Sequence, residues 1–349
     1  LLATAMTVTM FAGCGTPGSK DSKKDDSSAS SGKKRITYTL REDLPSMDPQ
    51  NSNSISCATA EICTYAMLTR NVEGEIKPDA AESWDISDDG LTYTFHLRKD
   101  AKWSDGEPIT AADFEYSWKR LVNPETASPY AFIGDCLKNG QAIEQGKMDV
   151  EELGVKAVDD TTLEVTLEHP TSYFLSLIGS SGQFAPLRQD IVEKYGTDFA
   201  ATSEKNVYSG PFVMTSSEDN VWTFEKNDNY WDKDSINLDK CELNYVENTD
   251  TQLSMYEAGD LDYVQVPTAY VSDYKDKADV FANGNVDFCY INSKSDNPVL
   301  GNKNFRLALN YALNRNDYNK LANADTFTAF NGLVFPGLQA KGTTYGEAY

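Results

Sequence analysis

Residues 86–120 read ISDDGLTYTFHLRKDAKWSDGEPITAADFEYSWKR. The pair Asp89-Gly90 is a turn signal, and after it apolar and polar residues alternate from Leu91 to Leu97, the period of a strand with one buried face. This pattern predicts a β-hairpin. Thr110, with Asp113 three residues later, forms a capping-box-like pair that opens a helix. Strand and helix signals therefore stand side by side in this stretch.

The same mixture continues outward in both directions. Alternation predicts a second hairpin at 155–167 and strands at 36–40, 221–224, 243–246 and 261–264. Apolar residues at helical spacing predict helices at 56–68, 110–122, 190–195, 251–258 and 305–313. The state of the apolar run 173–178 stays open. Together these elements predict an α/β or α+β architecture with more than one lobe.

The composition is that of a soluble globular protein with two or three domains. The chain has 349 residues, of which 40% are hydrophobic and 24% charged. Its formal net charge of −23 repels phosphate backbones, so we expect no nucleic-acid partner. Only two histidines, His96 and His169, are available for catalysis or metal binding. P-loop, metalloprotease and serine-hydrolase motifs are absent, and the G-x-G-x-x-G pattern at residues 13–18 has no strand before it and no helix after it. The 54 acidic residues leave a catalytic carboxylate pair open.

The amino-terminal residues are typical of an export signal. Residues 1–12 are apolar and uncharged, and Ala12 and Gly13 stand directly before Cys14, an arrangement that resembles the lipobox of bacterial lipoproteins. Residues 15–34 lack large apolar side chains, so we expect a flexible linker. We therefore expect residues 1–14 to be the remnant of a signal peptide, with a lipid anchor on Cys14. The alternative is an ordinary signal peptide with a chance cysteine.

The remaining five cysteines show no metal or redox spacing. No Cys-x-x-Cys pair occurs among them, and their number is odd. We expect buried or unpaired thiols, and leave open a pairing with a cysteine beyond residue 349. We predict neither a metal site nor a cofactor. The five residues are Cys57, Cys63, Cys136, Cys241 and Cys289.

Several motifs together resemble the extracellular solute-binding proteins of family 5. Residues 81–85 (AESWD) and 93–120 look like the signature region of that family, and residues 123–130 (NPETASPY) look like its oligopeptide-binding branch. Further matches keep the register, namely LGVKAVDDTTLEVTL at 153–167, SGPF at 209–212, YEAGDLD at 256–262 and NFRLALNYALNR at 304–315. The resemblance begins near Ile36 and runs to the end of the chain.

This resemblance implies an α/β, periplasmic-binding-protein-like fold of type II, cluster C. Such a fold has two lobes around a ligand cleft, and here an extra domain. Residues 35–67 and 187–285 would form lobe I, residues 68–186 the extra domain II, and residues 286–349 the start of lobe III. Because family members run well past residue 349, we expect the C-terminal part of the fold to be missing.

The implied function is a receptor, not an enzyme. It would capture short peptides between closing lobes, mainly through main-chain hydrogen bonds, and deliver them to the permease subunits of an ABC importer. Carried over position by position, the ligand-binding residues would be Asn53, Ile55, Tyr130 and Lys294. Asn53 stands where peptide-binding relatives have a glutamate, Ile55 replaces a valine, and Lys294 aligns only with a gap. Loop structure is the alternative role for Asn53 and Ile55, and core packing for Tyr130.

Several alternatives remain open. Within the family, the solute could be an oligosaccharide, nickel or haem, and the receptor could serve pheromone signalling and not uptake. A secreted carbohydrate hydrolase belongs to a different class and would turn over its ligand. If the protein belongs to this family, whatever its solute, we expect it on the outer face of the bacterial cytoplasmic membrane, extracellular or periplasmic.

Overall fold

The computed structural model describes residues 34–40, 42–280, 286–330, 332, 334–335, 338–340 and 343–344. The predicted signal peptide, the linker up to residue 33 and Cys14 lie outside the described residues. The chain divides into two compact units, which we describe separately. The larger unit contains residues 34–248 and 255–263, and the smaller unit contains residues 249–254 and the described residues from 264 onward.

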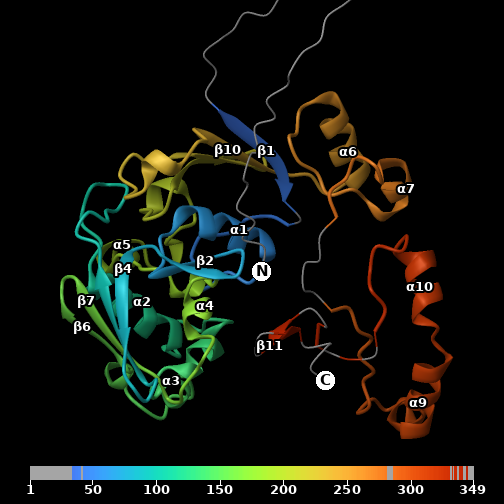
Figure 1. Ribbon diagram of the computed structural model, residues 1–349, viewed down its shortest axis with the longest axis horizontal. Coiled ribbons are helices and arrows are strands. Elements are labelled where there is room, and N and C mark those ends of the chain that lie inside the picture. The colour runs from blue at the N-terminus through green and yellow to red at the C-terminus, as the bar shows by residue number, and fades with distance from the viewer. Residues whose placement is uncertain are drawn as a thin grey trace, which may run out of the picture. The chain divides into compact units, whose positions relative to one another are not determined.

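An antiparallel sheet of four strands forms one half of the larger unit. Its order is β4 (Ala81–Ile86), β5 (Thr92–Leu97), β7 (Thr162–Thr166) and β6 (Val155–Asp159), so both predicted hairpins are confirmed. Tyr93, Phe95 and Leu97 of β5 are buried, as their alternation predicts. Helix α2 (Ala111–Val122) begins at the predicted capping box and lies against β6 and β7 (Figure 1).

The core beneath this sheet is aromatic. Phe114 and Trp118 of α2 are fully buried, and the indole Nε1 of Trp118 donates a hydrogen bond to the carbonyl of Phe184 at 2.9 Å. The rings of Trp118 and Phe184 meet edge to face, with centroids 5.0 Å apart. The undecided run 173–178 is helix α4 (Phe174–Ile178), whose Phe174 and Ile178 enter the same core.

A mixed sheet forms the other half of the larger unit. Its order is β1 (Arg35–Leu40), β10 (Lys240–Tyr245), β9 (Val221–Lys226) and β8 (Phe212–Glu218). β1 pairs in parallel with β10 (Figure 1). A strand near the start of the described residues therefore completes a sheet whose other strands lie about 200 residues further along the chain. Helix α1 (Ile55–Thr64) packs beside β8, over a second core that contains Leu40, Trp222 and Leu243.

Two local predictions differ from the structure, and one hairpin was not predicted. Residues 261–264 are no strand: only Tyr263 pairs, as an isolated bridge to Tyr38. The helix predicted at 56–68 ends at Thr64, because the chain becomes extended at Tyr65. The hairpin of β2 (Thr69–Val72) and β3 (Glu75–Pro78) was not predicted, and it turns at Gly74 with a φ of 88°.

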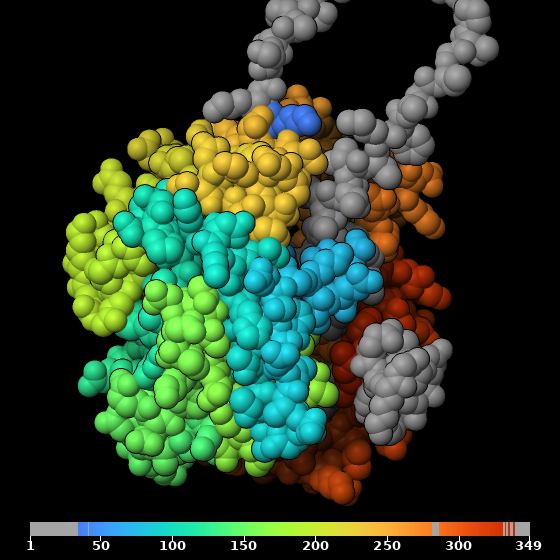
Figure 2. Space-filling view, turned by 60° about the vertical axis from the view of Figure 1, so that its left-hand side comes forward, coloured from blue at the N-terminus to red at the C-terminus, as the bar shows by residue number. Residues whose placement is uncertain are grey.

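Polar contacts connect Asp79 with Trp231, which packs against the core of the antiparallel-sheet half. The carboxylate of Asp79 accepts hydrogen bonds from Arg70 Nη2 at 2.9 Å and from Trp231 Nε1 at 3.0 Å. The guanidinium of Arg98 lies 3.7 Å from the centroid of the Trp231 ring. In the space-filling view, the yellow surface that contains β9 and β10 meets the cyan and green surface of the antiparallel-sheet half (Figure 2).

The other elements of the larger unit are short. They are α3 (Gly140–Glu144), α5 (Gln189–Tyr195) and the 3₁₀ helices η1 (Ala131–Cys136), η2 (Val150–Glu152), η3 (Gly182–Phe184), η4 (Gly196–Asp198), η5 (Ser203–Lys205) and η6 (Lys233–Ser235). Helix α5 confirms the prediction at 190–195.

The smaller unit is mainly helical. Helix α6 (Thr249–Ala258) crosses from one unit to the other, and the predicted helix at 305–313 is α9 (Lys303–Ala312). Asn302 and Asn314 cap α9 and α10 with their side chains. None of the described helices is long and apolar enough to cross a membrane. The other elements are η7 (Thr268–Tyr270), α7 (Val271–Tyr274), α8 (Pro298–Gly301), α10 (Arg315–Ala322), β11 (Gln339–Ala340) and β12 (Thr343–Thr344).

Candidate functional site

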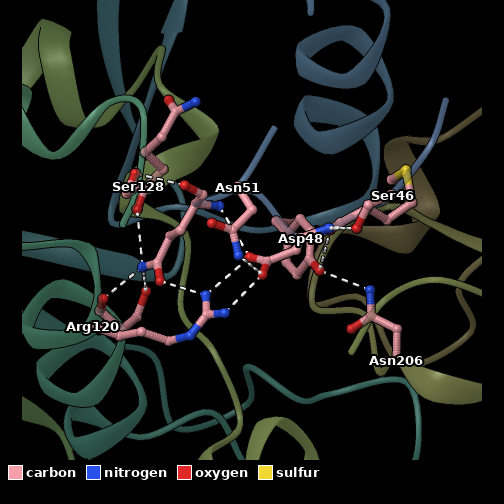
Figure 3. A network of polar contacts seen from close by, with 11 residues as sticks. Ser46, Asp48, Asn51, Arg120, Ser128 and Asn206 are labelled. Carbon is pink, nitrogen blue, oxygen red and sulfur yellow. Dashed lines mark hydrogen bonds and ion pairs between the residues drawn. The ribbon is translucent and has the colours of Figure 1, made fainter. Parts of the chain in front are cut away.

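A buried ion pair holds the segment that leads into α1. Arg120, at the end of α2, donates from Nη2 to Oδ2 of Asp48 at 2.7 Å and from Nη1 to Oδ1 at 3.0 Å (Figure 3). The side chains of Arg120 and Asp48 are only 14% and 6% exposed. Because the pair is bidentate and shielded from water, it restricts the direction of the segment as well as its position.

Gln50 extends this network into α2. Its side chain is fully buried, its Oε1 accepts from Arg120 Nη1 at 2.7 Å, and its Nε2 donates to Oγ of Ser117 at 2.9 Å. Ser117 in turn donates to the carbonyl of Ala185 at 2.5 Å. A buried amide whose donor and acceptor are both satisfied favours one conformation of the backbone that carries it.

One hydroxyl then connects two segments with predicted ligand contacts. Oγ of Ser128 donates to the backbone carbonyl of Gln50 at 2.5 Å and accepts from the backbone N–H of Tyr130 at 3.2 Å (Figure 3 shows Ser128 beside this network). Gln50 lies three residues before Asn53. The structure therefore links the segment of Asn53 and Ile55 to the segment of Tyr130.

The two predicted residues of the first segment, Asn53 and Ile55, face solvent. Asn53 is exposed and lies outside helices and strands, and in the described part of the chain its backbone N–H and C=O make no hydrogen bond. Ser54 caps α1 by accepting from the N–H of Cys57 at 3.0 Å, and Ile55, the first helical residue, is 54% exposed. Such a segment offers free main-chain groups beside an apolar side chain.

Tyr130 and Lys294 occupy different surroundings. Tyr130 is half-buried at the start of η1, with its ring centroid 5.7 Å from that of Phe132. Lys294 belongs to the smaller unit, in an exposed turn whose backbone N–H is held by Asn292 Oδ1 at 3.1 Å. The ligand roles of all four residues stay predictions.

A buried carboxyl lies on the same helix. Glu61 of α1 is 0% exposed, and neither of its oxygens makes a well-formed hydrogen bond among the described residues, although nearby Ser52 partly favours the ionised form. It faces Gly182 of η3, where a Cβ would lie 2.6 Å from its Oε2. Burial raises the pKa of Glu61 to about 8, so the carboxyl is mainly protonated at neutral pH.

The arrangement is suited to noncovalent binding. In the residues that the structure describes, no group of three or more His, Cys, Asp or Glu side chains lies close enough to hold a metal ion. The described cysteines are free thiols, and burial raises the pKa of Cys57 and Cys63. The exposed Asn53 offers amide groups of its backbone and its side chain, which can hydrogen-bond a ligand.

Sequence reasoning did not identify the residues that build this site. Asp48 and Arg120 are 72 residues apart, and Gln50 and Ser128 are 78 apart, so no local pattern pairs them. The only signal for Ser128 was its place two residues before Tyr130, in the stretch that resembles the oligopeptide-binding branch.

Comparisons with known proteins agree with this picture. The family model "Bacterial extracellular solute-binding proteins, family 5 Middle" matches residues 75–349. The dipeptide-binding protein DppE of Bacillus subtilis (strain 168) is 33% identical over 338 residues, which cover 96% of this chain and 61% of that protein.

Solved structures show the same fold. The structure of Listeria monocytogenes OppA bound to peptide has a TM-score of 0.80 at 35% identity and covers 88% of this chain and 62% of that one. The pheromone receptor PrgZ has a TM-score of 0.77 at 32% identity, covering 83% of this chain and 58% of that one. The chain thus spans about three fifths of the length of these relatives, and its predicted α/β solute-binding-protein fold is confirmed. From its motifs, its fold and these matches, the chain belongs to the bacterial extracellular solute-binding proteins of family 5.

Proposed function

We propose that this protein is the peptide-binding receptor of an ABC importer, that it does not turn over its ligand, and that Cys14 anchors it to the outer face of the bacterial cytoplasmic membrane. Relatives named for dipeptide and oligopeptide binding support the ligand class, and one solved relative is named as part of an oligopeptide ABC transporter. Replacing Cys14 by Ser should release the protein from membranes and abolish its labelling by a lipid precursor.

The observation that carries the proposal is the exposed Asn53 segment. An extended peptide can add to such a segment as a strand does to a sheet edge, through main-chain hydrogen bonds that are indifferent to ligand sequence. The unpaired N–H and C=O of Asn53 supply one donor and one acceptor among the described residues. Ile55 would pack against a ligand side chain, and Tyr130 would contact the peptide backbone.

We assign Lys294 to the ligand's C-terminal carboxylate, as a point charge that a free peptide terminus would meet. The domain boundaries belong to the same proposal: lobe I from residues 35–67 and 187–285, domain II from 68–186, and the start of lobe III from 286–349. The separate cores under the mixed sheet and the antiparallel sheet support the first boundary.

The test measures what the protein carries and what it binds. The protein is expressed from its own gene with Cys14→Ser, and its bound ligands are released and analysed by mass spectrometry. We expect short peptides of varied sequence and narrow length. Sugars, haem or nickel would replace the peptide proposal by another solute, and consumption of an oligosaccharide would overturn the receptor function.

Matched variants then test the site by calorimetry with one recovered peptide. Ile55→Glu places a charge on the proposed contact and should weaken binding by about tenfold or more. Ile86→Glu is the control, because Ile86 is similarly exposed, at 47%, but lies on β4. Equal affinities of the two variants would remove the Asn53 segment from the site while leaving the ligand class untouched.

A further inference from the structure

The antiparallel-sheet half of the larger unit has a surface hollow of about 410 Å³. None of Asn53, Ile55, Tyr130 and Lys294 lines it. Its walls come from η1, from the chain after β7 and from α4, and its lining residues are Phe132, Ile133, Asp135, Cys136, Glu168, His169, Thr171, Tyr173 and Leu177.

The walls of the hollow are held together by backbone contacts. The N–H of Glu168 donates to the carbonyl of Cys136 at 2.9 Å, and Leu137 pairs with Leu167 as a β-bridge. On the third side, Phe174 and Ile178 anchor α4 in the core. The hollow is therefore formed before any ligand arrives, which lowers the entropic cost of binding.

The charged residues of the hollow lack cationic partners. Asp135 and Glu168 line it together with His169, whereas no Lys or Arg does. Among the ion pairs of the described residues, none includes Asp135, Glu144 or Glu168. Oδ2 of Asp135 accepts a long hydrogen bond of 3.4 Å from Gln141, and its Oδ1 is shielded from solvent with no partner in the described part of the chain.

A neighbouring carboxyl adds to this negative potential. Burial, the negative charge of Asp135 and a hydrogen bond shared with Asp135 raise the pKa of Glu144, and the two acids repel each other when both are ionised. A bound cation would relieve this repulsion. Glu168 keeps its position because its Oε2 accepts from the backbone N–H of Asn139 at 3.1 Å.

Two aromatic rings of the lining remain exposed. Tyr173 is 63% exposed and Phe132 55%, whereas Phe174, next to Tyr173 in the chain, is fully buried. An aromatic face attracts an ammonium group and also packs against apolar carbon. Rings and carboxylates in one hollow therefore complement an amphipathic cation.

The protonation state of the Cys136 thiol indicates that the hollow binds a ligand and does not react with it. Burial raises the pKa of Cys136 to about 11, so it carries no nucleophilic thiolate at neutral pH. Its Sγ instead donates to the carbonyl of Ile133 at 3.4 Å. The hollow thus has acceptors, rings and a neutral thiol.

We propose that this hollow is a second binding site that takes a protonated primary amine bearing an apolar group. The ammonium donates to the carboxylates of Asp135 and Glu168, and the apolar group packs on Phe132 and Tyr173. No residue is shared between this site and the proposed peptide site, although the ring of Phe132 lies beside that of Tyr130, with centroids 5.7 Å apart.

Calorimetry with 2-phenylethylamine tests the site, with 2-phenylethanol and 3-phenylpropionate as neutral and anionic controls of similar shape. We expect the amine to bind with a Kd of about 1 mM or tighter, and the two controls not to bind. Asp135→Asn removes the charge and should weaken amine binding by about tenfold or more. Tyr173→Ser should weaken it about threefold, the contribution of an exposed ring.

Glu164→Gln is the matched control, because it removes an exposed carboxylate from the same sheet, on β7, outside the hollow. It should leave the affinity unchanged. Circular dichroism of each variant checks folding, and the exposed position of Tyr173 makes Tyr173→Ser the safer of the two test variants. Any one of three results would overturn the proposal. These are equal binding of amine and alcohol, an unchanged Kd for the amine in both test variants, and no binding of the amine at about 1 mM.

A second arm identifies the source of the amine. Nα-acetyl-lysine methylamide presents a lysine side chain and is too short to pair as an extended peptide. Tighter binding of this compound than of 2-phenylethylamine supports the site with a protein or peptide lysine as its occupant. The opposite order supports it with a free amine as its occupant.

Discussion

The buried carboxyl of Glu61 makes the stability of the larger unit depend on pH in a direction that can be worked out. Burial raises the pKa of Glu61 from 4.5 to about 8. Between these values the unfolded chain releases the proton and the folded protein keeps it, so the free energy of unfolding falls as pH rises, by about 1.4 kcal/mol per pH unit. The stabilisation is complete below the unfolded pKa and is lost as pH rises through the folded one.

The substitution Glu61→Gln should remove this dependence. Glutamine has nearly the shape of the protonated acid but cannot ionise, so it needs no proton to stay buried. We expect little difference from the native protein near about pH 5, and a variant more stable by about 3 kcal/mol near about pH 7.5. The exposed Glu82→Gln, on β4, is the control and should leave the curve unchanged.

Urea unfolding followed by tryptophan fluorescence measures this difference. All five tryptophans of the chain lie within the larger unit, so the signal reports on the unit that contains Glu61. If native protein and Glu61→Gln gave parallel stability curves from about pH 5 to about pH 7.5, Glu61 would be ionised or solvated in the folded state, and the reasoning from its burial would fail.

Three further substitutions test the packing around the proposed site. Gly182→Ala should cost about 1–3 kcal/mol in urea unfolding, because the new Cβ would lie 2.6 Å from Oε2 and 3.2 Å from Cβ of Glu61; an unchanged midpoint would mean that Glu61 moves freely. Arg120→Met should cost about 3–5 kcal/mol by leaving Asp48 buried without its cation, and adding Asp48→Asn should recover part of this loss in a double-mutant cycle. Thr110→Ala should cost about 1 kcal/mol through the cap of α2, measured by the same unfolding assay, and a neutral result would show that the cap does not support that helix.

Much of the fold could be predicted because it depends on neighbours in sequence. The Asp89-Gly90 turn, the alternation in β5 and the Thr110–Asp113 capping box use residues one to three apart, and each appears in the structure as predicted. The prediction at 261–264 failed because alternation alone does not supply a partner strand. In this stretch only Tyr263 has a partner, because it forms an isolated bridge with Tyr38.

The sequence by itself determined the family, the local elements and the segments with predicted ligand contacts, because motifs and periodicities are properties of short stretches of chain. Tertiary structure decided which of those segments meet. The pairing of Asp48 with Arg120 and of Gln50 with Ser128 joins residues more than 70 positions apart, and the burial of Glu61 depends on Gly182 of a distant element. Such contacts follow from packing, and burial sets the electrostatics, so neither can be read from a residue and its neighbours alone.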